Sequence, residues 1–168
     1  MTTAKRRERT EESMDDLHEI EAIKRLKYRY FRCLDLKLWD ELKTCFIEEA
    51  KSAYGDGKFS FDGREQIMQF LVDALGRPTI ITAHHGHHPE IELTSASTAT
   101  GIWSLEDTVI DLQHGINIRG AAFYRDEYVK VDGQWKLKFT GYQRTFEEME
   151  RRADTPSLQI TANRFASA

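Results

Sequence analysis

The chain has 168 residues, of which 40% are hydrophobic and 31% charged, and its formal net charge is −4. This length is typical of a single domain with a substantial core. The acidic balance argues against a nucleic-acid-binding surface, which needs a basic patch. No apolar run reaches the roughly 18 residues of a membrane-spanning helix. We therefore expect one soluble domain with neither nucleic acid nor a membrane as its partner.

Residues 1–12 carry several basic side chains but no apolar segment after them, which argues against a secretory signal. We interpret this stretch as a flexible tail and expect a cytoplasmic protein. The two cysteines, Cys33 and Cys45, fall in expected helices. Without an export signal they are expected to be buried free thiols rather than a disulfide.

The first half of the chain predicts helices and two short strands. Apolar residues recur at helical spacing from Ser13 to Leu34, and acidic residues after Ser13 suit a helix N-terminus. The expected elements are helices at 13–34, Leu38–Phe46 and Arg64–Leu75, with strands at Ala50–Tyr54 and Lys58–Phe61 around the Gly55-Asp56-Gly57 turn. Gly76 and Pro78 end the third helix.

The second half predicts long strands. The expected strands are Thr79–His85, Glu90–Thr94, Thr98–Asp111, Ala121–Val131 and Trp135–Phe146. Gly86 and Pro89 indicate a bulge or bend between the first two, and Asp132-Gly133 indicates a hairpin turn. Helices followed by antiparallel strands are typical of an α+β domain. Apolar residues on both faces indicate a strongly curved sheet, with one face around the helices and a cavity and the other against a partner subunit.

Three ionisable residues occupy positions where the pattern asks for apolar ones. Asp107 shares a strand face with Trp103 and Leu105, where an unpaired carboxylate is costly, unless the alternation breaks there. Asp35 follows Phe31 by one helical turn near a helix end, but it would equally suit a solvated loop. Tyr30 lies on the apolar stripe, where a tyrosine is commonly a core residue. On an ideal helix Tyr30 and Asp35 differ by about 140°, so they share a pocket only if the helix ends between them.

The segment His84-His85-Gly86-His87-His88 holds four of the six histidines. In a strand His85 and His87 would point the same way, which is a spacing that metal sites use. The alternative is that one histidine is a general base, held in its tautomer by a carboxylate. Asp107 would be that carboxylate if its strand pairs with the histidine strand.

Arg144 has two alternative orientations. Strict alternation places it with Tyr142 and opposite Trp135, whereas a bulge at Gly141 would reverse its direction. The pattern leaves both open. No Gly-x-Ser-x-Gly elbow, phosphate-binding loop or dinucleotide fingerprint occurs in the chain.

Several motifs together resemble the bacterial bile acid 7α-dehydratases, of the SnoaL-like branch of the NTF2-like superfamily. The matching motifs are Ile20-Glu21-Ala22-Ile23-Lys24, Tyr30-Phe31-Arg32-Cys33-Leu34-Asp35, Lys37-Leu38-Trp39-Asp40-Glu41-Leu42, His84-x-Gly86-His87-x-Pro89-Glu90-Ile91, Thr98-Ala99-Thr100-Gly101-x-Trp103-x-Leu105-Glu106-Asp107, Gly120-Ala121-Ala122-Phe123-Tyr124, Asp132-Gly133-Gln134-Trp135 and Thr140-Gly141-Tyr142-x-Arg144-x-Phe146-Glu147-Glu148. The likeness covers about residues 20–148, whereas the stretch 111–117 matches poorly and is shorter here.

The resemblance implies a cone-shaped NTF2-like fold with a deep pocket, a homotrimer, and neither a metal nor an organic cofactor. Its catalytic domain would span 13–150, with 151–168 as a C-terminal extension. The catalytic residues that it implies are Tyr30, Asp35, His84, Asp107 and Arg144. Further substrate contacts are expected from Tyr54, His87, Trp103 and Tyr142. In this scheme His84 is the base and Asp107 the carboxylate that orients it.

The implied reaction is loss of water from a 7-hydroxy-3-oxo-Δ4-steroid, as the free acid or a CoA thioester, to give the 4,6-dien-3-one. Three alternatives stay open. The site could serve an isomerase or cyclase acting on another enolisable ketone, the domain could be a non-catalytic ligand-binding module, or His85 and His87 could hold a metal. NTF2-like folds host many functions, so the fold alone does not choose among them.

Overall fold

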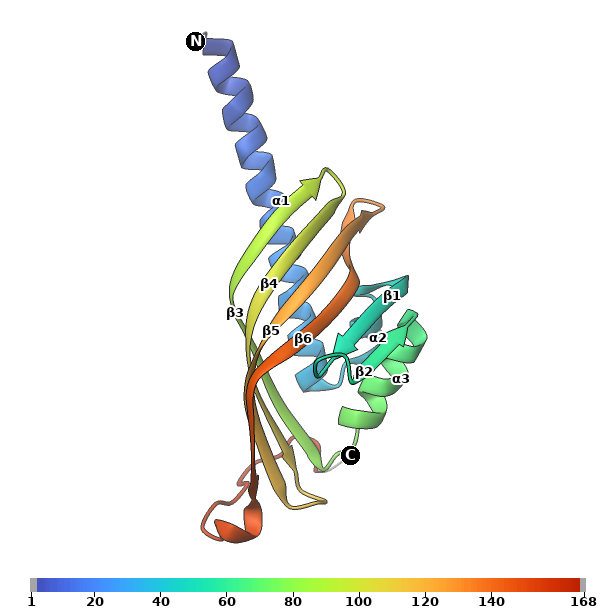
Figure 1. The fold of residues 1–168 in the computed structure, drawn as a ribbon, viewed down its shortest axis with the longest axis vertical. Coiled ribbons are helices and arrows are strands. Elements are labelled where there is room, and N and C mark those ends of the chain that lie inside the picture. Colours follow the sequence, from blue (N-terminus) through green and yellow to red (C-terminus); the bar gives the residue numbers. More distant parts are fainter. Residues whose placement is uncertain (1–2, 167–168) are drawn as a thin grey trace.

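The computed structural model describes residues 3–166, which form helices packed on one six-stranded sheet. The elements are α1 (Thr3–Leu36), α2 (Trp39–Lys43), β1 (Phe46–Tyr54), β2 (Phe59–Asp62), α3 (Arg64–Leu75), β3 (Ile80–Ser95), β4 (Thr98–Asp111), β5 (Ile116–Val131), β6 (Gln134–Arg151) and a 3-10 helix (Arg152–Asp154). Figure 1 shows the long strands β3 to β6 curving beside the C-terminal part of α1, with α3 beside β1 and β2. The expected α+β cone with a strongly curved sheet is confirmed.

The elements occur where the sequence predicted them, but several are longer than predicted. Strand β1 begins at Phe46 instead of Ala50, β5 begins at Ile116 instead of Ala121, and β6 ends at Arg151 instead of Phe146. Helix α3 and strand β4 have the predicted bounds. Helix α1 begins at Thr3, ten residues before the predicted start at Ser13. Helix α2 ends at Lys43, so the prediction of Cys45 in a helix is wrong, and this residue lies in the turn before β1. Strand β3 runs unbroken through the histidine segment, where a register shift between His87 and Glu90 forms the expected bulge.

The sheet order is β2-β1-β6-β5-β4-β3, and every neighbouring pair is antiparallel except β1 and β6, which are parallel. The three long hairpins therefore carry most of the sheet. They place β3 at one edge, where α1 packs against it. We call the sheet face toward α1 the inner face; it carries the alternating buried residues Ala122, Tyr124, Asp126 and Tyr128 of β5.

The core lies between the inner face and one stripe of α1. Its α1 members are Ile23, Leu26, Tyr30, Phe31, Cys33 and Leu34, which recur at helical spacing as predicted. Gly86 in β3 allows α1 to come close, because a Cβ there would lie 2.9 Å from Cζ of Phe31. This contact fixes the separation between the helix and the histidine strand.

A bulge at Lys138 decides which way the second half of β6 faces. Leu137 pairs with Tyr128 but Phe139 pairs with Glu127, so Lys138 is the extra residue. Beyond it Thr140, Tyr142 and Arg144 share the inner face with Trp135 and Leu137. The predicted reversal occurs, three residues before Gly141.

Both cysteines are buried free thiols, as expected. Burial raises the pKa of Cys33 to about 11. Among the helices in the part of the chain that the structure describes, none is long and apolar enough to cross a membrane.

Candidate active site

His84 and Asp35 form a hydrogen-bonded pair between β3 and the end of α1. The imidazole Nδ1 lies 2.7 Å from Asp35 Oδ1, and the backbone N–H of His84 donates to Oδ2 over 2.9 Å. Thr82, on the same face of β3, donates its hydroxyl to Oδ1 over 2.8 Å. The His84 side chain is 10% exposed. With Nδ1 bound to the carboxylate, Nε2 is the ring nitrogen left to exchange a proton with a ligand.

The hydrogen bonds keep Asp35 ionised despite its burial. Burial by itself would raise the pKa of this carboxyl, but the bonds and charge of His84 and the Thr82 hydroxyl outweigh it, so the pKa lies below its usual value. An ionised carboxylate stabilises the imidazolium that a histidine base becomes after it takes a proton. The pair therefore has the arrangement of a base and the group that orients it.

Asp107 binds Arg144 instead of His84. The predicted role of Asp107 as the carboxylate that orients the histidine is thus wrong in this structure, although His84 and Asp107 are register partners. Arg144 Nη2 donates to Asp107 Oδ2 over 2.8 Å and Nη1 bonds Oδ1, which makes the contact bidentate. Asp35 is the carboxylate that orients His84 instead, because α1 ends beside β3.

Arg144 reaches Asp107 across the intervening strand β5. Gly120 is the β5 partner of Asp107, and a Cβ there would lie 2.7 Å from Arg144 Nη1. Burial alone would lower the pKa of Arg144, but Asp107 more than offsets this, and the pKa is raised above its usual value. Asp107 and Arg144 thus form a charged pair next to His84, with the Arg144 side chain 15% exposed.

Four tyrosines line the inner face next to this pair. They are Tyr30 of α1, Tyr54 of β1, Tyr124 of β5 and Tyr142 of β6. The hydroxyls of Tyr30 and Tyr54 are 3.3 Å apart, and the Arg144 guanidinium stacks over the Tyr142 ring at 5.0 Å. Burial raises the pKa of Tyr30 and Tyr54, so both are hydrogen-bond donors at neutral pH.

The expected catalytic residues form two neighbouring groups. One holds the two charged pairs, Asp35 with His84 and Asp107 with Arg144, and the other holds Tyr30 with the remaining tyrosines. Helix α1 continues through Leu36, so Tyr30 and Asp35 point to different neighbours, as the helical angle requires. Asp35 joins His84 on β3, whereas Tyr30 joins the tyrosines. Ring contacts link the groups, because Tyr142 lies 5.3 Å from Tyr124 and beside Arg144. A deep pocket that unites all five stays a prediction; a hollow of about 360 Å³ lies on the outer face, beside Phe123 and Phe139.

The other histidines of the cluster lie away from this site. His85 and His87 are exposed on the outer face, with stacked rings 6.0 Å apart, as their spacing predicts. His87 therefore points away from His84, contrary to its expected role as a substrate contact. In the described part of the chain, no group of three or more His, Cys, Asp or Glu side chains could hold a metal ion.

Sequence analysis missed a buried ion pair beneath the tyrosines. Lys27 Nζ lies 2.8 Å from Asp126 Oδ2, and neither side chain is exposed. Trp103, an expected substrate contact, is fully enclosed and donates its indole N–H to Tyr128, which binds Asp126. The sequence pattern indicates this pair, because Lys27 lies on the apolar stripe of α1 and Asp126 alternates with the buried Tyr124 and Tyr128 on β5.

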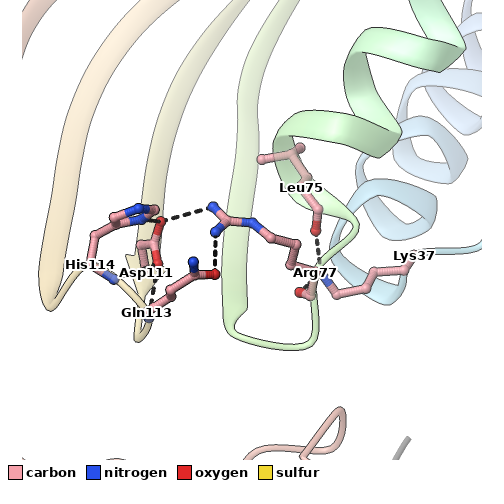
Figure 2. Close-up of polar contacts among 6 residues, drawn as sticks. All are labelled: Lys37, Leu75, Arg77, Asp111, Gln113 and His114. Carbon is pink, nitrogen blue, oxygen red and sulfur yellow. Dashed lines mark hydrogen bonds and ion pairs between the residues drawn. The ribbon is translucent and has the colours of Figure 1, made fainter.

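The poorly matched stretch 111–117 is held beside the ends of α1 and α3. Figure 2 shows Arg77 donating to Asp111 and Gln113, while Lys37 reaches the carbonyl oxygens of Leu75 and Arg77. Asp111 also binds His114, 2.7 Å away. Lys37 lies two residues after Asp35, so this cluster anchors the helix end that carries the carboxylate of the pair.

Comparison with known proteins identifies the class of fold. A structure of a candidate scytalone dehydratase from Novosphingobium aromaticivorans matches with 24% identity and a TM-score of 0.75, covering 90% of this chain and 95% of that one. A hexachlorocyclohexane dehydrochlorinase, LinA type 2, matches with 20% identity and a TM-score of 0.75, covering 89% and 97%. At these identities the likeness concerns the fold alone. It places the chain among the curved-sheet cones.

The family follows from the sequence match. The model of the SnoaL-like domain matches residues 15–140, which is most of the chain. This protein therefore belongs to the SnoaL-like family.

Proposed function

We propose that this protein is a hydro-lyase that needs no cofactor and removes water from a 7-hydroxy-3-oxo-Δ4-steroid. The observation that carries the proposal is the His84–Asp35 pair, a histidine oriented by a carboxylate on the inner face. A second charged pair and a group of tyrosine donors adjoin it. Elimination next to an enone needs a base, a proton donor for the leaving group and a donor for the enolate oxygen, and these three kinds of group are present.

His84 is the base in this scheme. Its Nε2 takes the proton from C6, and the electrons of that C–H bond move through the enone onto the C3 oxygen, giving a dienolate. The dienolate then re-forms the C3 carbonyl as the C6–C7 double bond forms and the C7–O bond breaks. The imidazolium returns its proton to the departing hydroxyl, so water leaves and His84 is regenerated. Asp35 stabilises the imidazolium in between.

The remaining residues are assigned to the substrate's oxygens. Tyr30, a protonated donor, would stabilise the charge on the C3 oxygen as an oxyanion hole does. Tyr30 has no exposed surface, so the steroid A ring must occupy space opened among the tyrosines. Arg144, held by Asp107 and partly exposed, would polarise or position the hydroxyl side of the substrate.

The scytalone dehydratase and dehydrochlorinase names of the structural relatives both describe eliminations, which supports this reaction type. The steroid substrate is inferred from the resemblance to bile acid 7α-dehydratases.

We also propose that the protein is a homotrimer. Phe123 and Phe146, on the outer face of β5 and β6, are 46% and 54% exposed, and a neighbouring subunit would cover them.

The test is incubation with 7α- and 7β-hydroxy-3-oxo-Δ4-steroids, each free and as a CoA thioester, while the absorbance of the 4,6-dien-3-one is followed. We expect turnover of at least one substrate. His84→Ala should lower kcat by about 10²- to 10⁴-fold, and Tyr30→Phe should lower it by about 10²- to 10³-fold. His85→Ala, one residue away on the outer face, is the matched control and should retain wild-type turnover.

Comparing Asp35→Asn with Asp107→Asn shows which of the two carboxylates orients His84. If Asp35 holds the base, Asp35→Asn should reduce kcat to nearly the level of His84→Ala. No product from any of the four substrates would overturn the steroid assignment. Full turnover by His84→Ala would overturn the mechanism.

A further inference from the structure

Lys27 is a charged residue at the centre of the core, and the scheme above gives it no part. It lies on α1 one turn before Tyr30 and Phe31, and its side chain has no exposed surface. Its ammonium binds Asp126 and donates to the Thr140 hydroxyl over 3.4 Å. Burial lowers the pKa of Lys27, and Asp126 partly restores it.

Asp126 is fully engaged by donors. It accepts from the Tyr128 hydroxyl and from the Thr140 hydroxyl, each over 2.7 Å, as well as from Lys27. Trp103 donates in turn to Tyr128 over 2.9 Å. These bonds fix the carboxylate in the sheet, so the ammonium is held at one point under the tyrosines.

Stability alone does not account for such a pair. Replacing a buried ion pair by apolar residues of similar volume is often neutral or stabilising, because desolvation of both charges offsets their attraction. Polar residues at these two positions therefore point to a task that an apolar pair could not perform.

The position of the ammonium indicates that task. Lys27 Nζ lies 3.6 Å from the ring centre of Tyr124 and 4.6 Å from that of Tyr30. Tyr30 in turn meets Tyr54 through its hydroxyl. The cation therefore lies directly behind the aromatic donors of the site, in a water-excluded interior where electrostatic interactions are strong.

We propose that Lys27 is a positioning residue whose positive charge, acting through the Tyr30 and Tyr124 rings, stabilises negative charge on a ligand oxygen bound by the tyrosine hydroxyls. This inference rests on the proposed function, since it takes the tyrosines to be the enolate donors. The ligand class is an enolate or phenolate of a fused-ring compound. Asp126 holds Lys27 in place and keeps it protonated. Burial is the main cause of the raised pKa of Tyr54 and Tyr124, and the negative charge of Asp126 adds to it, so Asp126 partly opposes the effect of Lys27.

The experiment uses 2-naphthol, a fused-ring phenol whose ionised form mimics the enolate and absorbs differently from the neutral form. Titration of the bound probe against pH gives its ionisation constant on the protein, independently of turnover. In Lys27→Met the constant should fall by about tenfold or more, because a positive charge is lost beside the phenolate. Lys27→Arg keeps the charge and should restore it to within about threefold of wild type.

Circular dichroism checks that each variant is folded. If Lys27→Met fails to fold, Lys27→Gln, which keeps a polar side chain beside Asp126 without the positive charge, takes its place and should lower the constant by a similar factor. Equal ionisation constants in wild type and the neutral variant would overturn the inference, as would a loss in Lys27→Arg as large as in Lys27→Met. Absence of naphthol binding to the wild-type protein would overturn the donor site of the proposed function, and this inference with it.

Discussion

Replacing Gly86 by alanine should test the close packing of α1 on β3. A Cβ at Gly86 would lie 2.9 Å from Cζ of Phe31 and closer still to a neighbouring ring carbon. Phe31 is 6% exposed and sits among other rings, so it has little room to move. The helix and the strand must therefore separate to accept the methyl group.

The cost follows from overpacking. A methyl group forced into a filled core costs typically about 1–3 kcal/mol. We expect Gly86→Ala to lower the free energy of unfolding by about 2 kcal/mol. Phe31→Leu should relieve the clash, so the double variant should be more stable than the sum of the single effects by about 1 kcal/mol or more. The separation would also lengthen the contact between Asp35 on α1 and His84 on β3.

Urea unfolding of the four proteins in this double-mutant cycle gives the coupling energy. A second cycle with Phe46→Leu is the control, because Phe46 is a buried ring that is absent from the nearest atoms around Gly86. That cycle should be additive. An alanine variant as stable as wild type, or equal coupling in both cycles, would refute the packing argument.

Three other outcomes are expected from contacts described above. The pKa of Asp35 is depressed in the folded protein, so the ionised carboxylate stabilises the fold above the pKa that Asp35 has in the unfolded chain. This stabilisation is lost as the pH falls through the pKa of Asp35 in the folded protein. Asp35→Asn should therefore flatten the acid limb of a curve of unfolding free energy against pH. Asp107→Asn leaves Arg144 without its bidentate partner and should lower the free energy of unfolding in urea by about 2–3 kcal/mol. This is near the low end for a broken buried pair, because Glu147 also contacts the arginine. A loss below about 0.5 kcal/mol would contradict this. Cys33 is buried with a pKa near 11, so iodoacetamide should alkylate it in the native protein far more slowly than in urea at pH 8, and equal rates would show that the thiol is accessible.

The sequence predicted the bounds of an element well where its apolar residues followed a single helical or strand periodicity. Helix α3 has a clear apolar stripe between Gly63 and Gly76, and β4 alternates without interruption, so the bounds of both were predicted. Helix α2 was predicted too long because the apolar residues at its end, Cys45 and Phe46, belong to a turn and a strand. Local apolar content does not distinguish a helix end from a buried strand start.

Several residues of the candidate site were singled out from the sequence, but how they pair was not predicted. Asp107 was recognised as buried from alternation alone, and it is 5% exposed. Which carboxylate meets His84 depends on how α1 crosses β3, and that long-range geometry leaves no periodic mark on the sequence. The buried pair of Lys27 and Asp126 did leave such a mark. The pattern of α1 was interpreted only through its apolar members, so the lysine among them was passed over.

The bulge at Lys138 lets β6 hold one residue more than the opposing stretch of β5 while its inward-facing residues stay inward. Lys138 itself is exposed, so many substitutions there would be tolerated. Its deletion would leave Leu137 and Phe139 opposite Tyr128 and Glu127, so Thr140, Tyr142 and Arg144 would still face inward. Straightening the strand with Lys138 kept would instead turn these three residues outward together. The polar interior of β6 therefore depends on backbone geometry at this position and not on the lysine side chain.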